Sequence, residues 1–107
     1  MKWQVTFLDE AVFAEFENLS DDLKASFLRI SRLIEGNGLE RVHEPYVKHL
    51  QGPLWEMRMK GKDGIARAAY VTASGRRVVV VHVFVKKTQK TPRREIDYAL
   101  KKAREVK

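Results

Sequence analysis

The sequence predicts an α+β fold in which a twisted antiparallel β-sheet is flanked by an N-terminal helical hairpin and a C-terminal helix. Apolar residues recur at helical spacing over residues 10–35 and again over residues 92–103, whereas they alternate at strand spacing between residues 54 and 85. Short turns that contain glycine separate the alternating segments. Because 107 residues provide for one hydrophobic core, we expect residues 1–107 to form a single domain.

The first third of the chain predicts a strand followed by two helices. Trp3, Val5 and Phe7 alternate with polar residues, which indicates a strand. Asp9 and Ser20 can cap the two helices, because a side-chain oxygen at that position accepts a hydrogen bond from a first-turn N–H group. The second helix has an apolar stripe at i, i+4, i+7 and i+11, which consists of Leu23, Phe27, Ile30 and Ile34.

The second half of the chain predicts three consecutive strands, over residues 54–60, 65–72 and 77–85, that pair as an antiparallel meander after an optional short strand. The last of them is nearly all β-branched, so we expect it to be covered on both faces. Thr91 can then cap a final helix with Pro92 at its first position. Trp3 and Trp55 lie on the apolar phase of their strands and are interpreted as core residues.

The charge of the chain points to a polyanionic partner. Lys and Arg number 21 against 14 Asp and Glu, which gives a formal net charge of +7, and residues 86–94 hold five bases and no acid. A polarised basic domain suits nucleic acid, an acidic protein or an anionic membrane, and an ordinary solvated basic surface is the alternative. The hydrophobic fraction of 44% excludes a disordered chain.

Cysteine usage and the N-terminal segment bear on location. The chain has no cysteine, so it has no disulfide and no thiolate metal site, which suits the reducing cytoplasm. The first ten residues contain no apolar signal core, so export is not expected. The longest apolar run, residues 78–85, is interrupted by His82 and is too short to span a bilayer. We therefore expect a cytoplasmic protein that does not associate with membranes.

Several common catalytic motifs are missing from the sequence. His43, His49 and His82 lack an i, i+4 partner or a nearby acidic cluster, so no metal site is expected. No glycine-rich phosphate loop follows a strand, and no serine stands in a nucleophile elbow. We therefore expect neither a metal nor a cofactor.

The remaining candidates are polar residues at strand spacing and a basic segment before the last helix. Glu56, Arg58 and Lys60 share one face of a strand, because side chains two residues apart point the same way. Arg67 lies in the next strand among small residues, where an arginine needs an anion or a position at the rim. Residues 86–91 contain three lysines and precede a helix N-terminus, which attracts anions. Each feature also fits a solvated sheet face or an exposed turn, so the pattern alone leaves both interpretations open.

These segments resemble the HigB-type toxins, which form the phage-related branch of the RelE/ParE superfamily. The most specific part of the resemblance is residues 83–92 (VFVKKTQKTP), followed by Arg94, Glu95, Ile96 and Ala99. Upstream, residues 47–50 (VKHL), residues 54–58 (LWEMR), Arg67 and Tyr70 are also similar to that family. The order of elements agrees, and the resemblance covers nearly the whole chain.

The resemblance implies a toxin of a type II toxin–antitoxin system that cleaves mRNA in the decoding site of the 70S ribosome. It also implies a cognate antitoxin that carries a helix-turn-helix. Cleavage without a metal uses the ribose 2′-hydroxyl as the nucleophile and needs a base, cations and an acid. The catalytic candidates in this chain are Glu56, Arg58, Arg67, Lys86 and Lys87. The candidate RNA contacts are Lys48, Lys60, Tyr70 and Lys90.

Two other functions fit the same fold, because fold does not determine function. The first is inhibition of DNA gyrase, as in ParE-like members of the superfamily. The second is RNA binding without catalysis. Superfamily members often carry a His or Tyr near the C-terminus, and residues 104–107 (REVK) contain neither, so the general acid is not identified by the resemblance. His82 is a weaker acid candidate, because a histidine inside a central strand is more often packed in the core.

Overall fold

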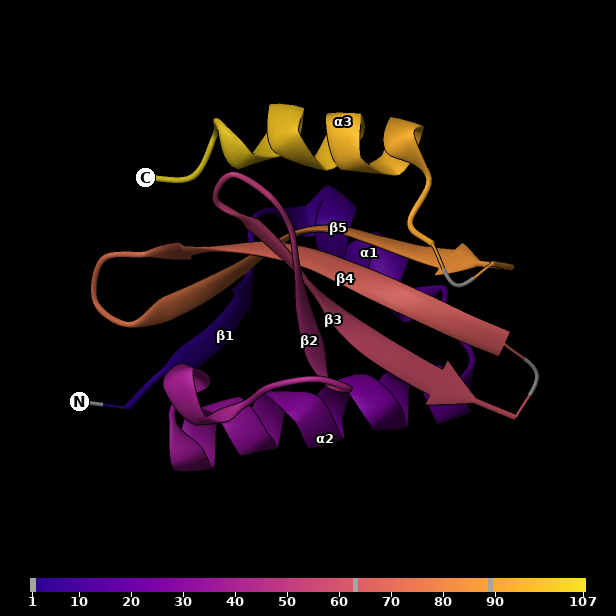
Figure 1. Cartoon of the computed structure of the whole chain (residues 1–107), viewed down its shortest axis with the longest axis horizontal. Helices are drawn as coiled ribbons and strands as arrows, with labels where there is room; N and C mark the ends of the chain where they lie inside the picture. Colours follow the sequence, from indigo (N-terminus) through magenta and orange to yellow (C-terminus); the bar gives the residue numbers. More distant parts are fainter. Residues whose placement is uncertain (1, 63, 89) are drawn as a thin grey trace.

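The chain folds into a twisted sheet with helices on both faces (Figure 1). The computed structural model describes residues 2–62, 64–88 and 90–107. Within those residues it has five strands, three α-helices and one short 3-10 helix, in the order β1 (Gln4–Phe7), α1 (Glu10–Glu17), α2 (Asp21–Asn37), η1 (Leu39–Arg41), β2 (Val47–Gln51), β3 (Leu54–Gly61), β4 (Gly64–Ala73), β5 (Arg77–Lys86) and α3 (Arg93–Ala103). Asp63 of a predicted turn and Gln89 of the basic segment lie outside the described residues.

The sheet is mixed, whereas the sequence predicted an antiparallel sheet. The strand order is β1-β5-β4-β3-β2, and β1 pairs with β5 in parallel while the other pairs are antiparallel. The predicted meander of β3, β4 and β5 is confirmed. No hairpin joins β1 to β5, because α1 and α2 first carry the chain to the opposite edge. A long crossover of this kind is what a parallel pair requires, and the local alternation of β1 does not encode it.

The predicted N-terminal helical hairpin is not confirmed. The chain begins with strand β1, and the two helices that follow pack mainly on different strands, α1 on β5 and α2 on β3. Their predicted caps are confirmed: a side-chain oxygen of Asp9 accepts a hydrogen bond from Val12 N at 2.9 Å, and Ser20 Oγ accepts one from Leu23 N at 3.4 Å. Helix α2 ends before Gly38, whose φ of 93° is costly for other residues.

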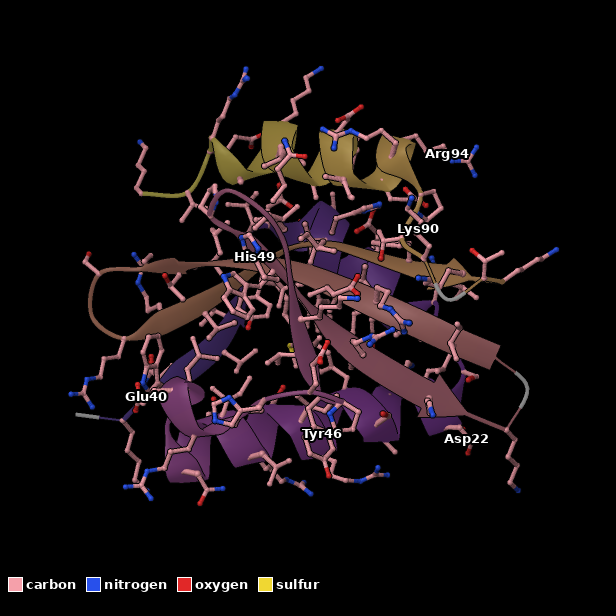
Figure 2. All side chains as sticks on the ribbon, in the orientation of Figure 1. Asp22, Glu40, Tyr46, His49, Lys90 and Arg94 are labelled. Atoms are coloured by element: carbon pink, nitrogen blue, oxygen red, sulfur yellow. The ribbon has the colours of Figure 1, made fainter. Side chains whose placement is uncertain are left out.

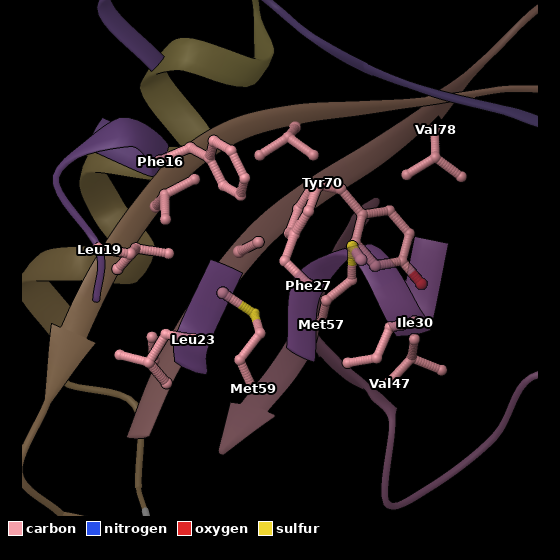
Figure 3. Close-up of a cluster of buried hydrophobic side chains, with 14 of the residues drawn as sticks. Phe16, Leu19, Leu23, Phe27, Ile30, Val47, Met57, Met59, Tyr70 and Val78 are labelled. Carbon is pink, nitrogen blue, oxygen red and sulfur yellow. The ribbon is translucent and has the colours of Figure 1, made fainter. Parts of the chain in front are cut away.

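The main core lies between α2 and the sheet (Figure 3). All four residues of the predicted α2 stripe are buried, and they meet a sheet layer that includes Met57, Met59, Tyr70 and Val80. Trp55 follows the same alternation but is 39% exposed, so its prediction as a core residue is wrong. It lines a cavity of about 820 Å³ instead. Trp3 is partly buried against the main core.

A second, smaller core lies under α3 and covers only part of the opposite sheet face. It consists of buried residues from β3, β4, β5 and α3, namely Leu54, Ala69, Val71, Val79, Val81 and Ala99. The rest of that face carries polar side chains from the same three strands. Helix α3 begins at Arg93 with Pro92 as its N-cap, one residue later than predicted, and Thr91 does not cap it. No helix in the described ranges is long and apolar enough to cross a membrane.

The edge of β3 is covered by β2 only over its first half. The last residue pair between the two strands is Val47 with Met57. Beyond it, Arg58 N donates to Tyr46 O at 2.8 Å and Lys60 N donates to Ser26 Oγ at 3.3 Å. A loop carbonyl and an α2 side chain therefore take the place of a neighbouring strand.

Candidate functional site

A cluster of polar side chains lies on the α3-side face of the sheet, beyond the apolar part that α3 covers. It is formed by Glu56 on β3, Arg67 on β4, Lys86 on β5 and Thr91 after β5, which are 2%, 2%, 5% and 7% exposed. Strand register brings them together, because Arg58 pairs with Arg67 and position 65 on β4 pairs with position 86 on β5. Buried ionisable groups are costly unless they are paired, so this concentration points to a functional site.

Glu56 is the centre of the cluster. Its Oε1 accepts a hydrogen bond from the hydroxyl of Thr91 at 2.6 Å. Its Oε2 lies 3.3 Å from Nε of Arg67 and 3.7 Å from Nε of Arg58. One buried carboxylate thus holds two guanidinium groups side by side. Planar guanidiniums in this arrangement are suited to bind the oxygens of a phosphate.

Arg67 is the more deeply buried of the two buried cations in the cluster. Burial lowers the pKa of Arg67, and the neighbouring Glu56 carboxylate opposes that effect while Arg58 adds to it. One guanidinium nitrogen, Nη1, donates to Ala66 O at 3.0 Å, which fixes the plane of the group. An arginine remains charged even when buried, so Arg67 supplies a fixed positive charge.

Lys86 can change its charge near neutral pH. Burial lowers the pKa of Lys86 to about 8, and repulsion from Arg67 acts in the same direction. Glu56 opposes the shift, while Arg58 and Lys48 add to it. The ammonium group of Lys86 donates to Thr91 Oγ1 at 3.4 Å. A lysine with a pKa near the working pH can transfer protons.

Exposed cations surround the buried cluster. The side chain of Arg58 is 21% exposed and so reaches the surface above Arg67. Lys48, Lys60, Lys87 and Lys90 are exposed on β2, β3 and the segment after β5. Figure 2 shows Lys90 beside the start of α3, at the end of the helix that faces the cluster. Among the described residues, Glu56 is the one acid that is buried, and the exposed side chains named here are cations. Such an arrangement favours an anionic ligand.

The structure thus brings together four predicted catalytic residues, namely Glu56, Arg58, Arg67 and Lys86. Tyr70, predicted as an RNA contact, does not belong to this cluster. It is 1% exposed and packs in the main core on the opposite face, because residues three apart on a strand point to opposite sides. Burial raises the pKa of its hydroxyl. The described residues hold no group of three or more His, Asp or Glu side chains that could bind a metal ion.

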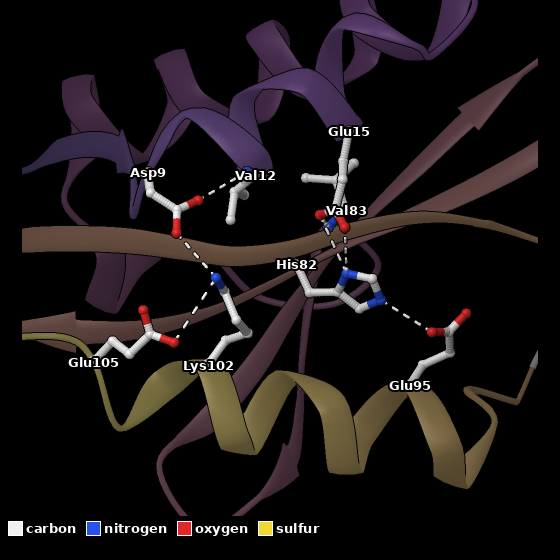
Figure 4. A network of polar contacts seen from close by, with 8 residues as sticks. All are labelled: Asp9, Val12, Glu15, His82, Val83, Glu95, Lys102 and Glu105. Atoms are coloured by element: carbon white, nitrogen blue, oxygen red, sulfur yellow. Dashed lines mark hydrogen bonds and ion pairs between the residues drawn. The ribbon is translucent and has the colours of Figure 1, made fainter.

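His82 is held by two carboxylates and ties three elements together (Figure 4). Its Nδ1 lies 3.1 Å from Oε2 of Glu15 on α1, and its Nε2 lies 2.9 Å from Oε1 of Glu95 on α3. Burial on its own lowers the pKa of His82, but the hydrogen bonds to Glu15 and Glu95 outweigh it and raise the pKa. Both ring nitrogens have carboxylate partners, so His82 acts as a packed link between α1 and α3.

The sequence of this chain matches one known protein family. The family model described as Phage derived protein Gp49-like (DUF891) matches residues 14–104. The chain belongs to this Gp49-like family. It is a RelE/ParE-type toxin-like family, so membership is consistent with a toxin of a toxin–antitoxin system and implies an antitoxin partner in general. A comparison with curated proteins finds no match.

The Gp49-like match includes every residue of the cluster, from Glu56 to Thr91. Sequence reasoning missed Thr91 as a partner of Glu56, because a helix-capping pattern is local whereas this contact spans 35 residues. It also missed Arg29 and Tyr46, which line a small cavity together with Arg58 and Arg67. An exposed tyrosine next to a proline in a loop carries no signal that would link it to a distant strand.

Proposed function

We propose that this Gp49-like protein is a HigB-type toxin that cleaves mRNA on the translating ribosome. The observation that carries the proposal is a set of three cations, Arg58, Arg67 and Lys86, around the carboxylate of Glu56, on the part of the sheet face that α3 leaves uncovered. Arg67, Lys86 and Glu56 are buried, whereas Arg58 is partly exposed. Three cations against one acid make a site for the negative charge that gathers on a phosphate during cleavage. In this proposal, a helix-turn-helix antitoxin neutralises the toxin.

The reaction joins the ribose 2′-oxygen to the adjacent phosphorus and breaks the bond from phosphorus to the 5′-oxygen. The products are a 2′,3′-cyclic phosphate and a 5′-hydroxyl. A base takes the proton of the 2′-hydroxyl, and an acid gives a proton to the departing 5′-oxygen. The cations stabilise the phosphate oxygens as charge develops on them.

The chemistry of each side chain supports the role that we propose for it. Arg58 is the accessible guanidinium and binds the scissile phosphate, while Arg67 holds positive charge beneath it. Lys86, with a pKa of about 8, gives its proton to the 5′-oxygen. Glu56 is the carboxylate of the cluster. Its Oε2 forms ion pairs with Arg58 and Arg67, and in this proposal it accepts the 2′ proton once Arg58 has turned towards the phosphate.

The test is cleavage in a reconstituted translation reaction, read by primer extension and by detection of 5′-hydroxyl ends. Arg58→Ala is expected to lower kcat/KM by about 100-fold or more, as for loss of a group that binds developing charge. The matched control is Arg104→Ala, which removes the same charge at the far, C-terminal end of α3 and keeps full activity (Figure 1). Thermal unfolding of both variants confirms that they fold.

Two results would overturn the proposal. The first is a wild-type protein that leaves transcripts intact on translating ribosomes but inhibits DNA gyrase. The second is a protein that binds RNA in a strongly salt-dependent way without producing new 5′-hydroxyl ends.

A further inference from the structure

A small cavity opens where the edge of β3 is no longer covered by β2. It has a volume of about 210 Å³ and lies between α2, the loop before β2 and strands β3 and β4. Among the described residues that line it are four bases and no acid, namely Arg29, Arg58, Lys60 and Arg67. Its volume is below the roughly 300–1,000 Å³ of pockets for drug-sized ligands, which suits a single ring or a phosphate.

Three backbone N–H groups at this edge already have acceptors. Arg58 N donates to Tyr46 O, Lys60 N to Ser26 Oγ, and Lys62 N to Asp22 Oδ2. An added β-strand would need these N–H groups, so the edge is closed to strand addition. What remains available at the cavity is side-chain chemistry: cationic heads and one aromatic ring.

That ring belongs to Tyr46, which is 41% exposed. Figure 2 shows Tyr46 over α2, on the front of the molecule. No aromatic ring of the described residues stacks on it, whereas the phenylalanines of the main core pack against one another. An exposed aromatic ring among cations is the arrangement with which proteins bind the bases of single-stranded RNA.

The cavity is continuous with the polar cluster, because Arg58 and Arg67 contribute to both. A phosphate bound by Arg58 in the cluster therefore has its neighbouring nucleotide within reach of the cavity. Arg29, which is exposed on α2, also lines the cavity and adds a cation that can bind a second phosphate of the same strand.

We propose that this cavity is a nucleotide subsite: Tyr46 stacks on the base next to the scissile phosphate, and Arg29 binds the following phosphate of single-stranded RNA. The inference rests on the proposed function for the identity of the scissile phosphate. It adds a binding element that α2 and the loop before β2 provide, outside the polar cluster on the sheet face.

The experiment measures binding of the purified full chain to a trinucleotide RNA that carries 2′-O-methyl groups and so cannot be cleaved. Tyr46→Ala is expected to weaken binding about tenfold, in line with the loss of one stacked base, and Tyr46→Phe is expected to keep it. Arg29→Ala is expected to weaken binding several-fold and to lower its salt dependence by about one phosphate contact. Arg32→Ala, an equally exposed arginine of α2 outside the cavity, is the matched control and binds as the wild type.

The possible outcomes separate this inference from the proposed function. The proposed subsite is wrong if Tyr46→Ala binds the trinucleotide as well as the wild type does, or if the wild type does not bind it at millimolar concentration. Either result leaves the proposed function standing where Arg58→Ala abolishes cleavage. If binding depends on Tyr46 and Arg29 but mRNA stays uncut, the subsite stands and the nuclease assignment fails. If an acidic peptide binds in a Tyr46-dependent way and RNA does not, the cavity serves a protein partner and the inference is overturned.

Discussion

The hydroxyl of Thr91 donates a hydrogen bond to Oε1 of Glu56 at 2.6 Å, across 35 residues of sequence. The same oxygen of Thr91 receives a hydrogen bond from Nζ of Lys86 at 3.4 Å. Thr91 therefore connects the acid and the lysine of the cluster. It also ties the cluster to the start of α3, because α3 begins two residues later, at Arg93.

Thr91→Val is expected to destabilise the protein by about 1–3 kcal/mol, because it leaves a buried carboxylate oxygen without its donor at nearly unchanged volume. Thr91→Ser keeps the hydroxyl and is expected to cost less. The measurement is urea denaturation at pH 7. Thr88→Val is the control: its hydroxyl is exposed and donates to the backbone oxygen of Lys90, so a change within about 0.5 kcal/mol is expected. Equal effects at both threonines would contradict the role of Thr91.

The pH dependence of cleavage tests Lys86 as the proton donor. The pKa of Lys86 is about 8 in the free protein, and kcat/KM reports groups of the free enzyme. As pH rises through about 8, Lys86 loses the proton that it must donate, so kcat/KM is expected to fall. Lys86→Arg stays charged, so this fall is expected to disappear, at a lower overall rate. Lys87→Arg changes the exposed neighbour of Lys86 and is expected to keep the fall in kcat/KM. If the fall in kcat/KM near pH 8 persists in Lys86→Arg, another group is responsible for it.

Lys86 is also expected to lower the stability of the fold. Its pKa is about 8 in the folded state and about 10.4 in unfolded chains, so the folded state binds its proton less tightly. The resulting penalty is fully present below pH 8 and disappears as pH rises towards 10.4. Lys86→Met is therefore expected to raise the free energy of unfolding at pH 7 by on the order of 1 kcal/mol, with a smaller gain at pH 10. Lys87→Met, on the exposed neighbour, is expected to change it little.

Much of the local structure could be predicted from the sequence. The caps Asp9 and Ser20 and the strands β3, β4 and β5 follow from patterns within a few residues, and each is present. Alternation also predicts that Glu56 and Arg58 share one face, and the ion pair between their side chains confirms it. Interactions between residues that are close in the sequence determine all of these features.

The features that sequence reasoning missed depend on contacts between distant segments. The parallel pairing of β1 with β5 is set by the crossover through the helices, and Trp55 is exposed on the wall of a cavity that distant segments form. The alternation of apolar and polar residues shows which side chains share a sheet face, but it does not show how far α3 covers that face. It therefore could not show that Glu56 and Lys86 are buried. Burial is what lowers the pKa of Lys86, so the chemical character of the site appears only in three dimensions.

The link between His82 and its two carboxylates should make stability depend on pH. The folded pKa of His82 is raised above its unfolded value of about 6.5, so its contribution is fully present below pH 6.5 and is lost as pH rises through the folded pKa. His82→Phe keeps a ring beside Phe84 and Tyr98 but loses both charged hydrogen bonds. It is expected to cost about 1.5–3 kcal/mol at pH 6 and less at pH 8.5. His43→Phe, at an exposed position, is the control and should show no such trend. A His82→Phe cost that is constant from pH 6 to 8.5 would mean that the ring is neutral and contributes through packing alone.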